Sequence, residues 1–142
     1  MIFGKRERVI RRILVVEDEP LVAFDNEHQL NDAGYEVVAT VDNMAAARAV
    51  IESEPLDLVL TDIRLAGEGD GTDVARIARE RGVPVLFVSG NCTEEARPLG
   101  VGCLAKPYSD KVLKGALDAL DHYLQGKRLK KLPAQLTLFE TV

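Results

Sequence analysis

The chain has 142 residues, of which 46% are hydrophobic, and this suits one domain with a buried core. Its formal net charge of -5 at pH 7 argues against a general nucleic-acid binder, which would carry a concentrated positive face. Residues 1–8 lack the apolar stretch of a secretory signal, and no later run is long enough to span a bilayer. We therefore expect a cytoplasmic protein.

Five short apolar runs alternate with segments of helical periodicity. The runs lie near residues 12–16, 36–41, 57–61, 84–88 and 101–104. Apolar residues recur at helical spacing over 21–33, 45–51, 74–78 and 112–124. This alternation predicts an α/β domain with a parallel sheet. We place the domain at residues 10–125, after a basic extension over 1–9 and before a tail over 126–142 that is too short for an output domain.

Two connections in this predicted domain stand out from the others. Residues 67–71 contain three glycines, which gives the loop after the third strand unusual backbone freedom. Residues 91–100 contain Pro98 and few large apolar side chains, so we expect at most a short helix there. Both connections follow strands that end in polar residues, and both are candidates for movement.

Polar residues follow four of the five predicted strands. They are Glu17 and Asp18 after the first strand, Asp62 after the third, Ser89 after the fourth and Lys106-Pro107 after the fifth. The carboxyl ends of parallel strands lie along one edge of a sheet, where ligands bind. Neighbouring strands are about 4.8 Å apart, so carboxylates from two of them can share a magnesium ion. The sequence therefore predicts one acidic site with a lysine beside it.

The order and spacing of these residues resemble the receiver domain of two-component response regulators over about residues 10 to 125. The resemblance implies a doubly wound, flavodoxin-like fold with five parallel strands in the order 2-1-3-4-5 and helices on both faces. It also implies that Asp62 is the nucleophile and that the product is a covalent aspartyl phosphate.

The same resemblance assigns the remaining site residues. Asp18 would bind Mg²⁺ directly, Glu17 directly or through water, and the main-chain carbonyl of Arg64 would complete the protein ligands alongside Asp62, with Mn²⁺ as an alternative ion. Lys106 and the Ser89 hydroxyl would each contact a phosphoryl oxygen. A cis peptide is expected at Lys106-Pro107.

Each of these residues also has an ordinary explanation when taken alone. Asp18 or Glu19 would serve as the N-terminal cap of the next helix, since Pro20 follows them. Lys106 alone would be a solvated surface charge, and Ser89 a turn residue. Their joint placement at separate strand ends favours the phosphoacceptor interpretation.

The chain departs from the receiver pattern at one position. The residue three places before the lysine is an aromatic in typical receivers, and here it is Cys103. The stretch from Pro84 to Gly90, with Pro98 downstream, resembles the FATGUY subgroup of single-domain receivers. That likeness implies a signal carried by residues 91–100, and we hypothesise that phosphorylation orders them. Cys92 and Cys103 fit no zinc pattern and are expected to be reduced thiols.

The favoured function is a single-domain response regulator that a histidine kinase or histidine phosphotransferase phosphorylates on Asp62. It would signal by protein contact or as a phosphate shuttle, and its only catalysis would be slow self-phosphorylation and self-dephosphorylation. The downstream protein is unknown, and neither direct DNA binding nor membrane attachment is expected. Leu136, Leu138 and Phe139 suggest that the tail packs on its own domain or forms a homodimer by β-addition.

Two other functions remain open from the sequence. One is a phosphorylation-independent, receiver-like scaffold or adaptor. This function stays open because Cys103 replaces the aromatic residue whose rotation reports phosphorylation in typical receivers. The other is a phosphohydrolase of the haloacid-dehalogenase type, which also uses an aspartate and magnesium. Such enzymes carry a second aspartate two residues after the nucleophile, and that position is Arg64 here. Multiple-turnover hydrolysis is therefore disfavoured.

Overall fold

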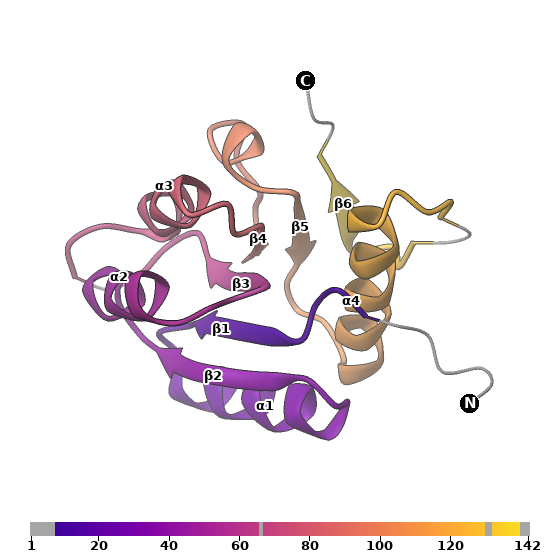
Figure 1. Ribbon diagram of the computed structural model, residues 1–142, viewed down its shortest axis with the longest axis horizontal. Helices are drawn as coiled ribbons and strands as arrows, with labels where there is room; N and C mark the ends of the chain where they lie inside the picture. Colours follow the sequence, from indigo (N-terminus) through magenta and orange to yellow (C-terminus); the bar gives the residue numbers. More distant parts are fainter. Residues whose placement is uncertain (1–7, 66, 130–131, 140–142) are drawn as a thin grey trace.

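The five predicted strands all form, and they pair in parallel in the predicted order. The computed structural model describes residues 8–65, 67–129 and 132–139. Its strands β1 (Arg12–Val16), β2 (Glu36–Val41), β3 (Leu58–Asp62), β4 (Val85–Ser89) and β5 (Gly102–Ala105) are arranged β2-β1-β3-β4-β5 (Figure 1). The carboxyl ends of these strands therefore lie along one edge of the sheet.

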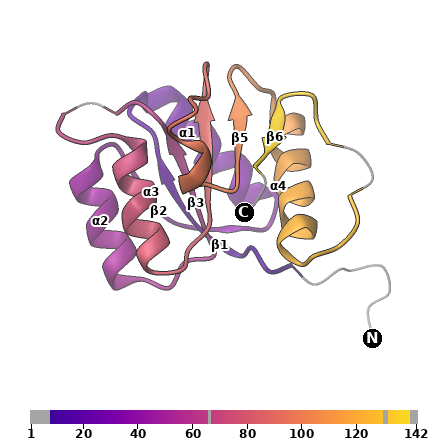
Figure 2. The same cartoon turned by 90° about the horizontal axis from the view of Figure 1, so that it is seen from above.

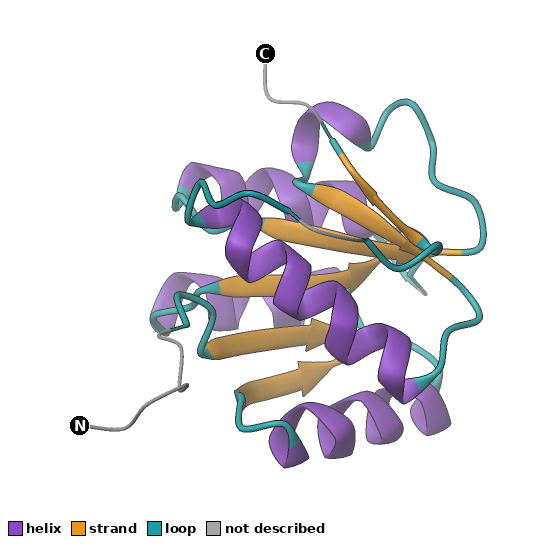
Figure 3. Ribbon diagram, turned by 90° about the vertical axis from the view of Figure 1, so that its right-hand side faces the viewer, coloured by secondary structure: helices purple, strands orange, loops and turns teal. Residues whose placement is uncertain are grey.

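In the part of the chain that the structure describes, four α-helices cover the two faces of the sheet. They are α1 (Pro20–Asp32), α2 (Met44–Ser53), α3 (Gly71–Glu80) and α4 (Asp110–Leu124). Alternate residues of β1 point to opposite faces: Ile13 packs in a core with α1 and α4, and Leu14 packs in a second core with α2 and α3. Figures 2 and 3 show helices on both sides of the sheet. Within the described residues, no helix has the length and apolar character needed to cross a bilayer.

Side-chain caps fix where three of the helices begin. Asn43 accepts the main-chain N–H of Ala46 at α2, and Ser109 accepts that of Val112 at α4. Asp70 forms a capping box with Asp73 at α3, which ends the glycine-rich loop at a defined point. Helix α1 is different, because its N-cap residue is Glu19 and makes no side-chain capping bond. Of the two residues considered as caps, Glu19 thus holds the N-cap position, but without a side-chain hydrogen bond.

A sixth strand corrects the expectation of a five-stranded sheet. Strand β6 (Leu136–Leu138) pairs antiparallel with β5, which would otherwise be an exposed edge. Leu136 and Phe139 are buried there, and the Phe139 N–H donates to the carbonyl of Val101 at 2.9 Å. The tail therefore packs on its own domain, which was one of the two options drawn from its apolar residues.

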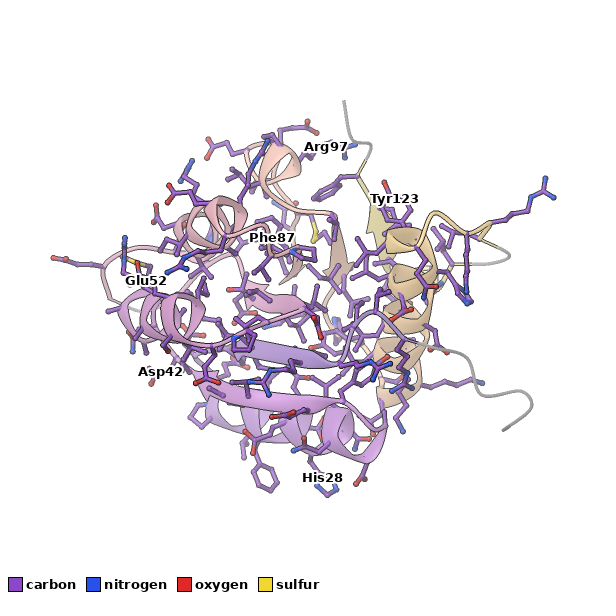
Figure 4. The ribbon with its side chains drawn as sticks, in the orientation of Figure 1. His28, Asp42, Glu52, Phe87, Arg97 and Tyr123 are labelled. Carbon is purple, nitrogen blue, oxygen red and sulfur yellow. A yellow bond between two sulfur atoms is a disulfide. The ribbon has the colours of Figure 1, made fainter. Side chains whose placement is uncertain are left out.

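The segment between β4 and β5 contains only one turn of 3-10 helix, η1 (Arg97–Leu99), as the weak helical signal predicts. Its one buried side chain is Ala96. The two cysteines are joined in a disulfide between Cys92 and Cys103, so the expectation of free reduced thiols is wrong for this structure (Figure 4). Sequence spacing gave no sign of this pairing, because it depends on the path of the loop past β5.

Candidate functional site

Strand register brings the first acidic residues together. Thr61 of β3 lies opposite Val16 of β1, so Glu17 and Asp62 leave adjacent strands at the same level. The loop after β3 brings Gly71 back against the end of that strand, where the Gly71 N–H donates to the carbonyl of Ile63 at 2.7 Å. A Cβ atom on Gly71 would lie 1.8 Å from the Asp62 carbonyl oxygen, so only glycine fits. The start of α3 is thus packed against the backbone that carries Asp62.

Three carboxylates share a small volume at this edge. Glu17, Asp18 and Asp62 each offer an oxygen, and these oxygens lie within 4.8 Å of one another. Glu17 and Asp62 are buried, with 3% and 6% of their surface exposed, and Asp18 is half-buried. Hard carboxylate oxygens at this spacing fit Mg²⁺, which keeps several water ligands and needs only one or two carboxylates from the protein.

Lys106 supplies the positive charge beside these carboxylates. Its Nζ lies 2.7 Å from Oδ1 of Asp62 and 2.9 Å from Oε1 of Glu17. The Lys106 side chain is 27% exposed, so it reaches the site without being a free surface charge. The peptide between Lys106 and Pro107 is cis, which confirms the expectation drawn from the resemblance.

The buried carboxyl groups of Asp62 and Glu17 shift each other's pKa. Burial raises the pKa of Asp62 to about 8, and the hydrogen bond with Glu17 adds to the rise while Lys106 opposes it. Burial also pushes the pKa of Glu17 upward, but hydrogen bonds with Asp62, the Glu19 main chain and Lys106 outweigh it and leave that pKa below its usual value. Burial lowers the pKa of Lys106, yet its bonds to Asp62 and Glu17 produce a net rise. Burial and the neighbouring Glu17 thus favour the protonated form of Asp62 in the metal-free site.

Ser89 and Arg64 lie apart from this cluster of contacts. Ser89 ends β4 beside Ala105 of β5, and its hydroxyl is held by the next loop. Its Oγ donates to the carbonyl of Asn91 at 2.9 Å and accepts the Asn91 N–H at 3.1 Å. Arg64 is exposed in the bend after β3, and the role of its carbonyl stays a prediction.

Three residues that sequence reasoning missed support the site. Thr61 is fully buried, and its Oγ1 donates to the carbonyl of Asp62 at 2.9 Å. The Tyr108 hydroxyl donates to Oδ1 of the buried Asn26 at 3.1 Å, which ties the turn after Lys106 to α1. Asn26 had no clear sequence signal, because the large apolar residues near the start of α1, Leu21 and Phe24, face solvent while Ala23, Asn26 and Leu30 are buried.

Comparisons with known proteins agree with this geometry. Residues 13–118 match the model of the response regulator receiver domain. The chain is similar to a response regulator receiver protein from Sinorhizobium medicae WSM419, with a TM-score of 0.68 and 34% identity, over 78% of this chain and 94% of that one. It is also similar to the receiver domain of the sensor histidine kinase PA1611 from Pseudomonas aeruginosa PAO1, with a TM-score of 0.67 and 29% identity, over 76% and 94%. That structure has a magnesium ion coordinated in its active site cleft.

A curated relative is similar over most of this chain. The transcriptional regulatory protein PdtaR of Mycobacterium tuberculosis is 34% identical over 116 residues, which cover 78% of this chain and 56% of that protein. The chain therefore spans about half the length of the curated relatives it matches.

Proposed function

Because the chain belongs to the response regulator receiver domain family, we propose that Asp62 accepts a phosphoryl group from a phosphohistidine of a histidine kinase or histidine phosphotransferase. The observation that carries this proposal is the contact of the Asp62 Oδ1 with Lys106 Nζ at 2.7 Å, inside a cluster of three carboxylates. An aspartate in this setting has a fixed cation beside it and two further carboxylates that can share a metal ion with it. The phosphorylated protein signals by contact with another protein or passes the phosphate on, and we assign it to the cytoplasm.

The transfer needs an ionised, correctly aimed carboxylate. The free oxygen of Asp62 attacks phosphorus, the P–N bond to the donor imidazole breaks, and its electron pair stays on the imidazole nitrogen. Lys106 turns from Asp62 to a phosphoryl oxygen as negative charge builds there. Ser89 donates to another phosphoryl oxygen after its hydroxyl leaves Asn91.

Glu17, Asp18, Asp62 and the Arg64 carbonyl are the residues that would hold Mg²⁺, or Mn²⁺ in its place. When bound, the ion neutralises charge on the acidic cluster and on the incoming phosphoryl group. Glu17 contributes here as a buried anion whose Oε2 also accepts the N–H of Glu19 at 3.1 Å, which fixes its direction. The same bond keeps the chain tight between β1 and α1.

An apolar patch on α1 suits docking of the phosphodonor. Leu21 and Phe24 are 84% and 71% exposed, and they lie in the first two turns of the helix that follows Asp18. The Phe24 ring stacks on His28 one turn further, with the centroids 6.4 Å apart. A donor domain that covered this patch would bring its histidine to the edge where Asp62 lies, so we assign the patch to that partner.

The proposal is tested with a small donor. Incubation with phosphoramidate and Mg²⁺ should add one phosphoryl group, which intact-mass spectrometry detects, and Asp62→Asn should abolish the gain. The exposed Asp118→Asn on α4 is the matched control and should still be phosphorylated. A chain that gains no phosphate while it binds Mg²⁺ would favour the scaffold function. Steady release of phosphate from small phosphate esters would favour a phosphohydrolase.

A further inference from the structure

The two cysteines join the loop after β4 to strand β5. Cys92 is exposed and lies three residues after Ser89, whereas Cys103 is only 1% exposed in the middle of β5. Cys103 stands opposite Phe87 of β4 and Thr137 of β6. The Cα atoms of the two cysteines are 6.4 Å apart, within the range that disulfides span. One anchor is thus rigid and the other belongs to a loop.

The loop anchor is next to the residue that holds Ser89. Asn91 binds the Ser89 hydroxyl through both its carbonyl and its N–H, and Cys92 follows it directly. For Ser89 to donate to a phosphate on Asp62, its hydrogen bond to the Asn91 carbonyl must break, because a hydroxyl has one proton to donate. A covalent link at Cys92 restrains the backbone that has to move away. The link therefore opposes the rearrangement that phosphorylation requires.

We propose that the Cys92–Cys103 pair is a redox modification site that controls the response to phosphorylation. The disulfide holds Cys92, and with it Asn91 in its hydrogen bonds to Ser89, and the dithiol releases this start of the loop. This inference rests on the function proposed for Asp62. It assigns a role to Cys103, which stands where typical receivers have an aromatic side chain.

The exchange uses a low-molecular-weight disulfide, RSSR, as oxidant. The thiolate of Cys92 attacks one sulfur of RSSR, forms a mixed disulfide and releases RS⁻. The thiolate of Cys103 then attacks the Cys92 sulfur, closes the intramolecular bond and releases the second RS⁻. The two cysteines lose two protons and two electrons, and RSSR takes up both to leave as two RSH. Reduction by RSH runs through the same steps in reverse.

The different exposure of the two cysteine residues favours a regulatory bond over a purely structural one. Cys92 is accessible to a thiol from solution, and Cys103 is shielded by β4 and β6 and acts as the second, resolving thiol. Disulfides in proteins that work among reduced thiols are usually transient and redox-sensing. The cytoplasmic location proposed for this protein therefore agrees with a reversible link.

The test compares the oxidised and reduced chain in binding beryllofluoride, a phosphoryl mimic, with Mg²⁺. Oxidised glutathione should remove both alkylatable thiols, and a dithiol reductant should restore them. Couplings between sites are typically about 5- to 150-fold, so we expect the dissociation constant of beryllofluoride to be at least about 5-fold higher in the oxidised form. By linkage, saturating beryllofluoride should shift the dithiol–disulfide equilibrium toward the dithiol by the same factor. Equal affinities in the two forms overturn the proposal, as does a failure of oxidised glutathione to close the bond.

Two variants separate this inference from the function on which it rests. Cys92→Ser replaces an exposed residue and should bind beryllofluoride like the reduced chain, with or without oxidant. Hydrogen exchange over residues 91–100 should change on binding in the reduced chain and in Cys92→Ser, and stay unchanged in the oxidised chain. Asp62→Asn should bind no beryllofluoride in either form. Equal, Asp62-dependent binding in both redox forms removes the redox site and leaves the phosphoacceptor intact, whereas no binding in the reduced chain removes both.

Discussion

Two regions of the same sheet edge hold their polar groups in different ways. The acceptor region, which comprises Glu17, Asp18, Asp62 and Lys106, is buried and set by strand register, with ion pairs of 2.7 and 2.9 Å. The 91–100 segment is mostly exposed, and its start is held by the Ser89–Asn91 hydrogen bonds and one disulfide. Its end is held by the buried Ala96 and by a hydrogen bond from Arg79 to the Pro98 carbonyl. The first region is preorganised for chemistry that occurs at a fixed point. The start of the second is attached through contacts that can be exchanged, as a reporter of that chemistry requires.

The largest expected effect comes from a pair of glycine substitutions, one beside each region. Gly71→Ala puts a Cβ 1.8 Å from the Asp62 carbonyl oxygen, so the backbone of the acceptor region must shift. We expect a loss of more than about 3 kcal/mol in the free energy of unfolding, measured by urea denaturation. Gly90→Ala meets nothing within 4 Å and should change stability by less than about 1 kcal/mol. Equal unfolding midpoints for the two variants would contradict the rigid packing inferred around Asp62.

The short C-terminal tail should contribute substantially to the stability of the sheet edge formed by β5 and β6. Phe139 is 3% exposed, the guanidinium of Arg97 lies 5.0 Å from its ring centroid, and its carbonyl accepts the Tyr123 hydroxyl at 3.0 Å. Phe139→Ala should cost about 2 to 4 kcal/mol by thermal or urea unfolding, because a buried ring is lost and the edge strand loosens. Thr137→Ala, on the exposed side of the same strand, should stay within about 0.5 kcal/mol. A large effect at Thr137 would show that the strand pairs differently.

The sequence was sufficient to predict the acceptor region because that region follows from local patterns. Buried strands such as Leu58–Asp62 read as apolar runs, and parallel pairing then carries their polar ends to one edge. Glu17 and Asp62 also stand at corresponding points, at the carboxyl ends of the apolar runs of β1 and β3, and the register of these strands sets them side by side. Spacing along the chain therefore translated directly into distance across the site.

The positions of the 91–100 segment and of the tail were harder to predict, because they depend on which part of the folded domain each one packs against. The alternation of Leu136, Thr137 and Leu138 suits a strand, but the pattern does not say that the free edge of β5 is its partner. The cysteines are 11 residues apart in sequence, and only the fold of the intervening loop makes them neighbours. The close approach of Gly71 was equally hidden, since glycine at a helix start has several explanations.

The raised pKa of Asp62 predicts how pH acts on the metal-free chain. This carboxyl has a pKa of about 8 in the folded state against 3.8 in a model peptide, so between these values the folded chain keeps a proton that the unfolded chain has released. Stability should therefore fall as pH rises from about 5 to about 8, by on the order of 1 to 3 kcal/mol. Glu17, whose pKa is lowered, adds stability above its usual pKa and loses it only in more acidic solution, so it does not reverse this trend.

Asp62→Asn isolates that effect. The variant has no carboxyl to ionise, so its urea midpoint in chelator should be higher than that of the unaltered chain near pH 8 and similar near pH 5. Mg²⁺ should stabilise the unaltered chain near pH 8, because it binds the ionised cluster in the folded state. A variant with the same pH slope as the unaltered chain would place the titration elsewhere. In that case, ionising the buried carboxylates of the acceptor region costs less folding stability than their burial indicates.

The smallest predicted effect concerns the surface between the acceptor region and its donor. Leu21→Ala and Phe24→Ala remove exposed side chains, so they should leave stability and phosphorylation by phosphoramidate unchanged. Phosphotransfer from the histidine phosphotransferase that acts fastest on the unaltered chain should fall about tenfold in kcat/KM, which corresponds to about 1.4 kcal/mol of lost binding. Val9→Ala, at an exposed apolar residue outside α1, should leave both donors unaffected. Equal loss with both donors would mean that the patch acts on Asp62 itself, and no loss with either would mean that the donor approaches over another surface.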